Sequence, residues 1–141
     1  MKIWKNDITA EQLNQWPQKS MADHLDLSIT EIGEDYIIGK MPVDERTKQP
    51  FGLLHGGASC VLAETLGSIA STLMINLEQE RAVGLEINAN HLRSVSSGYV
   101  YGKVTPIHLG RSTQVWDIRI QDEQQKLVCV SRLTMAIIRN T

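Results

Sequence analysis

The chain has 141 residues, of which 42% are hydrophobic and 21% charged, enough for one domain, residues 1–141, with a core of its own. Its formal net charge is −2, with both signs mixed along the sequence, so there is no electrostatic reason to expect a nucleic acid or an anionic membrane as partner. Residues 1–7 contain no apolar run, so we expect no secretory signal and a cytoplasmic location. Cys60 and Cys129 lie in apolar patterns without paired spacing, and we expect free thiols.

The first predicted elements are short. Thr9 and Gln12 have the spacing of a capping box that opens a helix, which we expect Pro17 to end. Residues 20–24 predict one more helical turn. Two strand-like segments and the turn between them follow, at 27–32, 36–41 and 33–35.

A loop and a long helix come next. Residues 44–57 show no sustained periodicity and contain Pro50, which is typical of a loop. From 57 to about 77 the apolar residues continue too long for a strand, and Ala, Leu and Met favour a helix. A helix that is apolar on nearly all sides is a buried helix. Its glycines, hydroxyl residues and one carboxylate argue against a membrane span.

The second half of the chain predicts a series of strands separated by short turns, which implies antiparallel neighbours. In the first strand we expect Val83, Leu85, Ile87 and His91 to share one face, because side chains alternate along a strand. One buried helix and a run of antiparallel strands predict an α+β fold with the sheet wrapped around the helix. The predicted strands are 83–92, 99–107, 113–120 and 127–138.

The segment 49–77 carries one formal charge, the carboxylate of Glu64. Burying an unpaired carboxylate in an apolar segment is costly. Glu64 is therefore either a satisfied carboxylate at a structural contact or a working group in a site. Ser68 lies one turn further on the same helix face, where it either orients the carboxylate or allows close packing.

Gly56 and Gly57 stand where the long helix begins. Free N–H groups and the helix dipole favour an oxyanion there; the alternative is a turn in which glycine serves only the backbone conformation. Gln49 and His55 flank this turn, although a lone histidine before two glycines is more often structural. Together with Glu64, these residues provide donors for the oxygen of an ester or thioester carbonyl and a carboxylate for its carbon.

The spacing of these groups predicts an oligomer. Gly56 and Glu64 are eight residues apart, which is about 12 Å along a helix, and the glutamate side chain recovers only part of that distance. One chain is therefore not expected to place both groups on the same carbonyl. We predict a two-fold dimer in which Gln49, His55 and Gly56 come from one subunit and Glu64 from the other.

The segment Gln-Pro-Phe-Gly-Leu-Leu-His-Gly-Gly at 49–57, followed by Glu64, resembles the hotdog-fold acyl-CoA thioesterases of the branch that includes 4-hydroxybenzoyl-CoA thioesterase. It is most similar to the bacterial 1,4-dihydroxy-2-naphthoyl-CoA hydrolases of menaquinone synthesis. The resemblance implies a dimer, commonly a dimer of dimers (a homotetramer). It also implies that Glu64 is the nucleophile or general base, that Gly56 forms the oxyanion hole, and that Gln49 and His55 bind or polarise the thioester. Further similar segments are 41–44, 84–91 and 114–116.

Two basic segments are candidates for binding CoA. Arg93 and Arg111 suit phosphate groups, and the resemblance implies that these regions hold pantetheine and nucleotide; we add Gly84 to this set. The alternatives are a solvated basic surface and a half-buried structural His91. The first segment is His91, Leu92, Arg93 and Ser94, and the second is His108, Leu109, Gly110, Arg111 and Ser112.

The sequence thus predicts hydrolysis of an aromatic acyl-CoA thioester without a metal or cofactor, because the four histidines show no ligand spacing and the cysteines lie in different elements. One alternative keeps the chemistry and changes the carrier: a proofreading thioesterase that removes misloaded aryl groups from a carrier protein. Another is a non-catalytic acyl-CoA-binding module. The hotdog dehydratases are disfavoured, since their Pro-rich loop around the histidine is absent.

Overall fold

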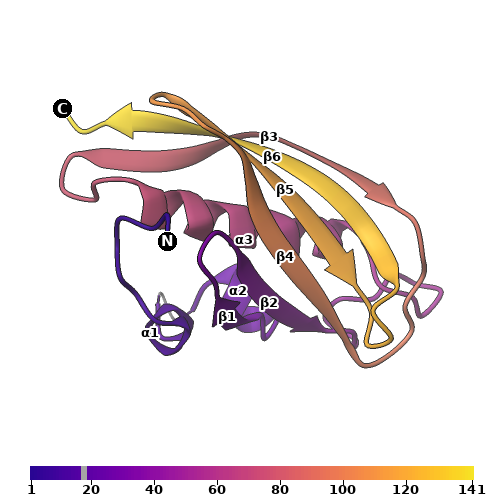
Figure 1. Ribbon diagram of the computed structural model, residues 1–141. Helices are drawn as coiled ribbons and strands as arrows, with labels where there is room; N and C mark the ends of the chain where they lie inside the picture. The colour runs from indigo at the N-terminus through magenta and orange to yellow at the C-terminus, as the bar shows by residue number, and fades with distance from the viewer. Residues whose placement is uncertain (17–18) are drawn as a thin grey trace.

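The computed structural model describes residues 1–16 and 19–141. Its strands form one antiparallel sheet in the order β1-β2-β4-β5-β6-β3, and Figure 1 shows this sheet curled around the long helix α3. The predicted α+β architecture is confirmed, whereas the expected helix end at Pro17 lies outside the described residues. The elements are α1 (Ala10–Asn14), α2 (Met21–His24), β1 (Ser28–Ile32), β2 (Ile37–Pro42), α3 (Gly56–Met74), β3 (Glu80–His91), β4 (Tyr99–Leu109), β5 (Thr113–Gln121) and β6 (Leu127–Arg139).

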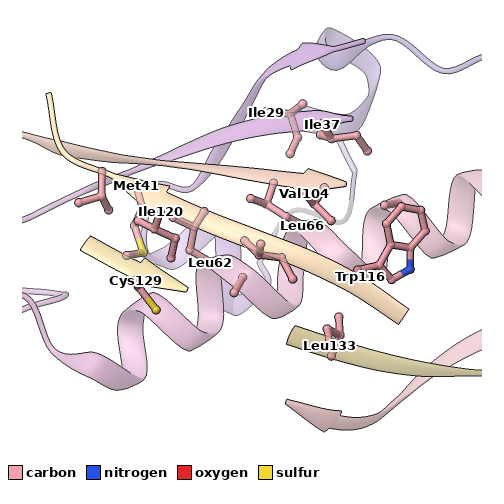
Figure 2. Close-up of a cluster of buried hydrophobic side chains, with 14 of the residues drawn as sticks. Ile29, Ile37, Met41, Leu62, Leu66, Val104, Trp116, Ile120, Cys129 and Leu133 are labelled. Carbon is pink, nitrogen blue, oxygen red and sulfur yellow. The ribbon is translucent and has the colours of Figure 1, made fainter. Parts of the chain in front are cut away.

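The core lies between α3 and the concave face of the sheet, where Figure 2 shows Leu66 and Trp116 among the packed side chains. Gly39 and Gly102 are cross-strand partners in β2 and β4. A Cβ atom at these positions would lie 2.8 and 2.7 Å from the Leu66 side chain, so both glycines allow the helix to approach the sheet. The Trp116 indole donates a hydrogen bond to Ser71 Oγ at 2.7 Å. By length and composition α3 would also suffice as a membrane span, but it is the core helix.

The N-terminal segment closes the end of α3. The Asn6 amide donates to the carbonyls of Leu73 and Ile75 at 3.3 and 2.9 Å, and the Asn6 backbone N–H donates to Leu73 O at 3.1 Å. These bonds satisfy carbonyls that a helix leaves free at its C-terminus. The helix therefore ends at Met74, before the position near 77 that we predicted.

The predicted capping box opens helix α1, with Gln12 N–H donating to Thr9 Oγ1 at 3.1 Å and Thr9 N–H to Gln12 Oε1 at 2.9 Å. The other end of α1 covers the β1 edge of the sheet with the Asn14 side chain. There, Asn14 Nδ2 donates to Ile29 O at 2.9 Å and Asn14 Oδ1 accepts from Ile29 N–H at 2.6 Å. Asn14 thus pairs with the outer edge of β1 as a neighbouring strand would. The opposite edge strand, β3, has no such neighbour among the described residues.

The alternation along β3 differs from the prediction. Its register against β6 shifts between Gly84 and Glu86, so Leu85 is the extra residue of a β-bulge. Ile87 packs against the core, whereas Val83 and Leu85 are 41% and 62% exposed. The prediction that these three side chains share one face is wrong, because the bulge moves the inward position by one residue.

Candidate active site

Glu64 lies in the middle of α3 and its carboxylate touches the bulged part of β3. A Cβ atom at Gly84 would lie 2.7 Å from Glu64 Oε1, so only glycine leaves room for the carboxylate at this point. One turn further, the Ser68 hydroxyl faces Met135 Sδ at 3.9 Å. The structure thus places Gly84, which we had assigned to CoA binding, next to the predicted catalytic carboxylate.

The Glu64 side chain is half-buried and lines a cavity of about 380 Å³. The helix α3 forms one side of this cavity, and α1, α2 and β1 form the other. The carboxylate is thus neither buried among apolar side chains nor held in an ion pair with another described residue. Besides Glu64 and Ser68, the cavity is lined by Leu13, Trp16, Met21, Ile29, Thr65 and Ile69, among others.

The N-terminus of α3 presents hydrogen-bond donors. His55 is the N-cap residue, and its Nδ1 accepts the Gly57 N–H at 2.8 Å. An accepting Nδ1 carries no proton, so the ring proton sits on Nε2 and is free to donate. Among the described residues, no acceptor faces the Gly56 N–H. A Cβ atom at Gly56 would lie 2.8 Å from His91 Nε2, so glycine also lets the His91 ring lie over this turn.

The loop before α3 orients Gln49. The Gln49 backbone N–H donates to Leu53 O at 2.8 Å, and the His55 N–H donates to Thr47 O at 2.8 Å. The side-chain Oε1 of Gln49 accepts the Phe51 N–H. Because the carbonyl end of the amide is engaged within the loop, its NH₂ group remains available as a donor.

Gln49 and Gly56 line a second cavity, also of about 380 Å³, which includes neither His55 nor Glu64. The structure therefore brings Gln49 and Gly56 together with the first predicted CoA segment, and separates them from the carboxylate of the same chain. This is the separation expected from the eight-residue spacing along the helix. The cavity is lined by Gln49, Gly56, His91, Leu92, Arg93 and Ser94, among others.

The second predicted CoA segment lies at the other end of the sheet. Ser112 O accepts the Ile137 N–H at 2.9 Å, and Ile137 pairs with Ala82 near the start of β3. His91, at the end of β3, is nine residues from Ala82, or about 30 Å at 3.3 Å per residue. One chain therefore does not bring the two basic segments together. The segment comprises His108, Leu109, Gly110, Arg111 and Ser112.

Neither cysteine is suited to act as a nucleophile. Both thiols are free, as expected, and Cys129 is buried. Burial, with a smaller contribution from Glu64, raises the pKa of Cys60, and burial raises the pKa of Cys129 to about 11. Since the thiolate is the reactive form, these raised pKa values argue against Cys60 and Cys129 as nucleophiles.

A carboxylate in the middle of a sheet-wrapped helix and free donors at its start are groups that can serve as base and as oxyanion donors when an acyl bond is cleaved. The family model of the thioesterase superfamily matches residues 51–129, a range that contains both groups. The fold and this match define a hotdog-fold thioester hydrolase, and the chain belongs to the thioesterase superfamily.

Relatives match almost the whole chain. The 1,4-dihydroxy-2-naphthoyl-CoA hydrolase of Escherichia coli is 55% identical over 136 residues, covering 96% of this chain and 99% of that protein. The proofreading thioesterase EntH of Cronobacter sakazakii is 51% identical over 136 residues, covering 96% and 98%. The crystal structure of a thioesterase from Haemophilus influenzae superposes with a TM-score of 0.94 at 54% identity, covering 97% of this chain and 95% of that one.

Some site features were not predicted from the sequence. The cavity wall formed by Leu13, Trp16 and Met21 lies more than forty positions before Glu64 in the chain, and no local pattern signals that contact. The bulge at Leu85 was also missed. The glycine before it was the available signal, because glycine inside a strand often marks a bulge or a close approach.

Proposed function

We propose that this thioester hydrolase acts on an aromatic acyl-CoA and releases the free acid and CoA. The observation that carries the proposal is the Glu64 carboxylate in a compact cavity of about 380 Å³. An apolar cavity of about 150 Å³ holds one benzene ring, so this cavity suits an acyl group of one or two rings. The name of the E. coli relative supports the 1,4-dihydroxy-2-naphthoyl group. A role in menaquinone synthesis, in the cytoplasm, is part of our proposal.

In the proposed mechanism, the thioester carbonyl oxygen accepts hydrogen bonds from the Gly56 N–H and from the donors of Gln49 and His55. These donors stabilise the negative charge that develops on the oxygen. Glu64 acts in one of two ways. It attacks the carbonyl carbon, expels CoA thiolate and forms an anhydride that water then hydrolyses, or it removes a proton from the attacking water.

The proposed active site combines two subunits, because Glu64 of one chain lines one cavity, whereas Gln49 and Gly56 of the same chain line another. Asn14 occupies the β1 edge of the sheet, whereas β3 offers an edge with exposed Val83 and Leu85. An open edge strand is a template for pairing with another chain. Antiparallel pairing of β3 with β3 of a second copy would form the two-fold dimer, and two such dimers would form the homotetramer.

The same dimer supports a CoA site shared between subunits. Antiparallel pairing of two β3 strands sets the Arg93 end of one strand beside the start of the other, where the 108–112 turn lies. Phosphate groups then contact Arg93 of one subunit and Arg111 of its partner. We expect Arg111→Glu to raise KM for an acyl-CoA far more than KM for the same acyl group on pantetheine, which lacks the nucleotide. Equal changes in both KM values would remove Arg111 from the CoA site.

A second candidate function keeps the chemistry and changes the carrier. It is supported by the Cronobacter sakazakii relative, which is a proofreading thioesterase. Comparing kcat/KM for naphthoyl-CoA, benzoyl-CoA and the same aryl groups on a carrier protein separates the two. A preference for the carrier-bound thioester would favour proofreading.

The main test of the proposed function is thiol release from naphthoyl-CoA, followed with a thiol reagent. Glu64→Gln should lower kcat by about 10²- to 10⁴-fold, the range for loss of a general base. Glu78→Gln, which removes an exposed carboxylate beyond the end of α3, serves as the matched control and should retain kcat. Near-normal turnover by Glu64→Gln would refute the role of this carboxylate.

A single turnover in ¹⁸O-water separates the two routes. If Glu64 attacks the carbonyl and water then opens the anhydride at the Glu64 carbon, the label enters the Glu64 carboxylate, so label in Glu64 identifies the nucleophilic route. If Glu64 acts only as a base, the label appears only in the released acid.

A further inference from the structure

We propose that the described N-terminal residues 10–16 and 19–29 form the wall of the active-site cavity that selects the acyl group, and that Asn14 is the positioning residue that holds this wall in place. The inference rests on the proposed function. The inference adds that this segment determines the size of the acyl group that the cavity accepts.

Both sides of the cavity combine polar and apolar side chains. Glu64, Ser68 and Ile69 face it from α3. The N-terminal segment contributes the large apolar side chains of Leu13, Trp16 and Met21, together with the polar Asn14, Ser20 and Asp23. Trp16 and Met21 are 45% and 66% exposed, so both side chains retain apolar surface that a bound acyl group would cover. Ligand pockets combine this kind of apolar lining with a few polar groups. An acyl group with its carbonyl at Glu64 would therefore lie against Trp16 and Met21.

Asn14 fixes the distance between this wall and α3. Its side chain makes two hydrogen bonds with the backbone of Ile29, of 2.9 and 2.6 Å, and Asn14 and Ile29 both line the cavity. The short helix α1 would otherwise be held mainly by the buried Leu13 side chain. Removing the amide would loosen α1 on β1 and change the shape of the cavity without touching the carboxylate.

The wall and the catalytic helix belong to different parts of the chain. The match to the superfamily model covers 51–129, which includes Glu64 and Ser68 but none of segment 10–29. The chemistry therefore resides in the part common to the superfamily, and the wall lies in a part outside it. A change in the wall should alter the preference between acyl groups rather than lower the rate with all of them.

The test compares kcat/KM for 2-naphthoyl-CoA with kcat/KM for dodecanoyl-CoA. Trp16→Ala should enlarge the cavity and shift this ratio toward the long chain by about tenfold or more, the size of effect seen when a hydrophobic pocket changes its fit. The variant should fold, because Trp16 is partly exposed. Asn14→Ala should shift the ratio in the same direction and also speed hydrogen exchange of the Ile29 amide.

The matched control is Asn6→Ala, which removes the hydrogen bonds that another asparagine side chain donates at the end of α3. It should lower Tm and leave the ratio unchanged. An unchanged ratio in both Trp16→Ala and Asn14→Ala, or an equal loss with both substrates, would overturn the inference. If the wild-type protein hydrolysed neither CoA ester, both the proposed function and this inference would be wrong. If the wild-type protein is active and only the predicted change in the substrate ratio is missing, this inference alone is wrong.

Discussion

His55 has an observed role as a helix cap and a proposed role as a donor to the substrate, and one substitution separates them. Its Nδ1 caps α3 through the Gly57 N–H, and its Nε2–H remains free to polarise a carbonyl. Asparagine is a good N-cap residue but lacks that donor. We expect His55→Asn to stay within about 0.5 kcal/mol of wild type in urea unfolding, while kcat falls by about 10- to 100-fold. Full kcat in His55→Asn would show that the histidine serves only as a cap.

The contact between Gly84 and Glu64 is the most direct steric test of the carboxylate. A Cβ atom at Gly84 would lie 2.7 Å from Glu64 Oε1, so Gly84→Ala should displace the carboxylate and lower kcat by about tenfold or more. The control, Gly102→Ala, introduces a similar clash with Leu66 and should lower stability but not kcat. A Gly84→Ala enzyme with unchanged kcat and an unchanged fold by circular dichroism would contradict the assigned position of Glu64.

The Cys129 thiol predicts how stability depends on pH. Burial raises its pKa from the ordinary value of 9.0 to about 11, so the folded state keeps the proton more tightly than the unfolded state. This contribution is fully present below pH 9 and is lost as pH rises from 9 through 11. Between these values, the free energy of unfolding should fall by about 1.4 kcal/mol per pH unit more in wild type than in Cys129→Ala. Parallel pH profiles from urea unfolding would contradict this.

At the scale of the elements, local patterns predicted most of the fold. The capping box at Thr9, the buried helix and the strands of the second half all follow from periodicity and turn residues, which act between near neighbours in the chain. The bulge at Leu85 and the end of α3 did not follow. Both depend on partners distant in sequence: β6 for the bulge and Asn6 for the helix end.

The Asn6 contact with the end of α3 predicts a specific loss of stability. The Asn6 amide donates to carbonyls of α3 and of Ile75 just after it. Net hydrogen-bond contributions are about 0.5–1.5 kcal/mol each, so Asn6→Ala should lower the free energy of unfolding by about 1–3 kcal/mol. Differential scanning calorimetry should show a lower Tm with kcat unchanged. A Tm equal to that of wild type would mean that the backbone bonds of the segment suffice.

At the scale of the whole molecule, the sequence was enough to predict that Gly56 and Glu64 of one chain lie apart, because helix rise fixes their separation, and the structure places them in different cavities. It did not reveal what encloses the carboxylate, since the wall at Trp16 comes from a segment with no local signal for that contact. It also did not show that Arg93 and Arg111 lie at opposite ends of the sheet, which depends on the length of β3 and its pairing.

The central claim is that each active site takes its carboxylate from one subunit and its donors from the other. The direct measurement is to unfold and refold, in equal amounts, a Glu64→Ala chain and a chain carrying Gln49→Ala and His55→Ala, and then to assay naphthoyl-CoA hydrolysis. Half of the dimers would be hybrids with one intact site of two, so activity should return to about a quarter of wild type. Activity no higher than the mean of the two inactive parents would contradict the shared site.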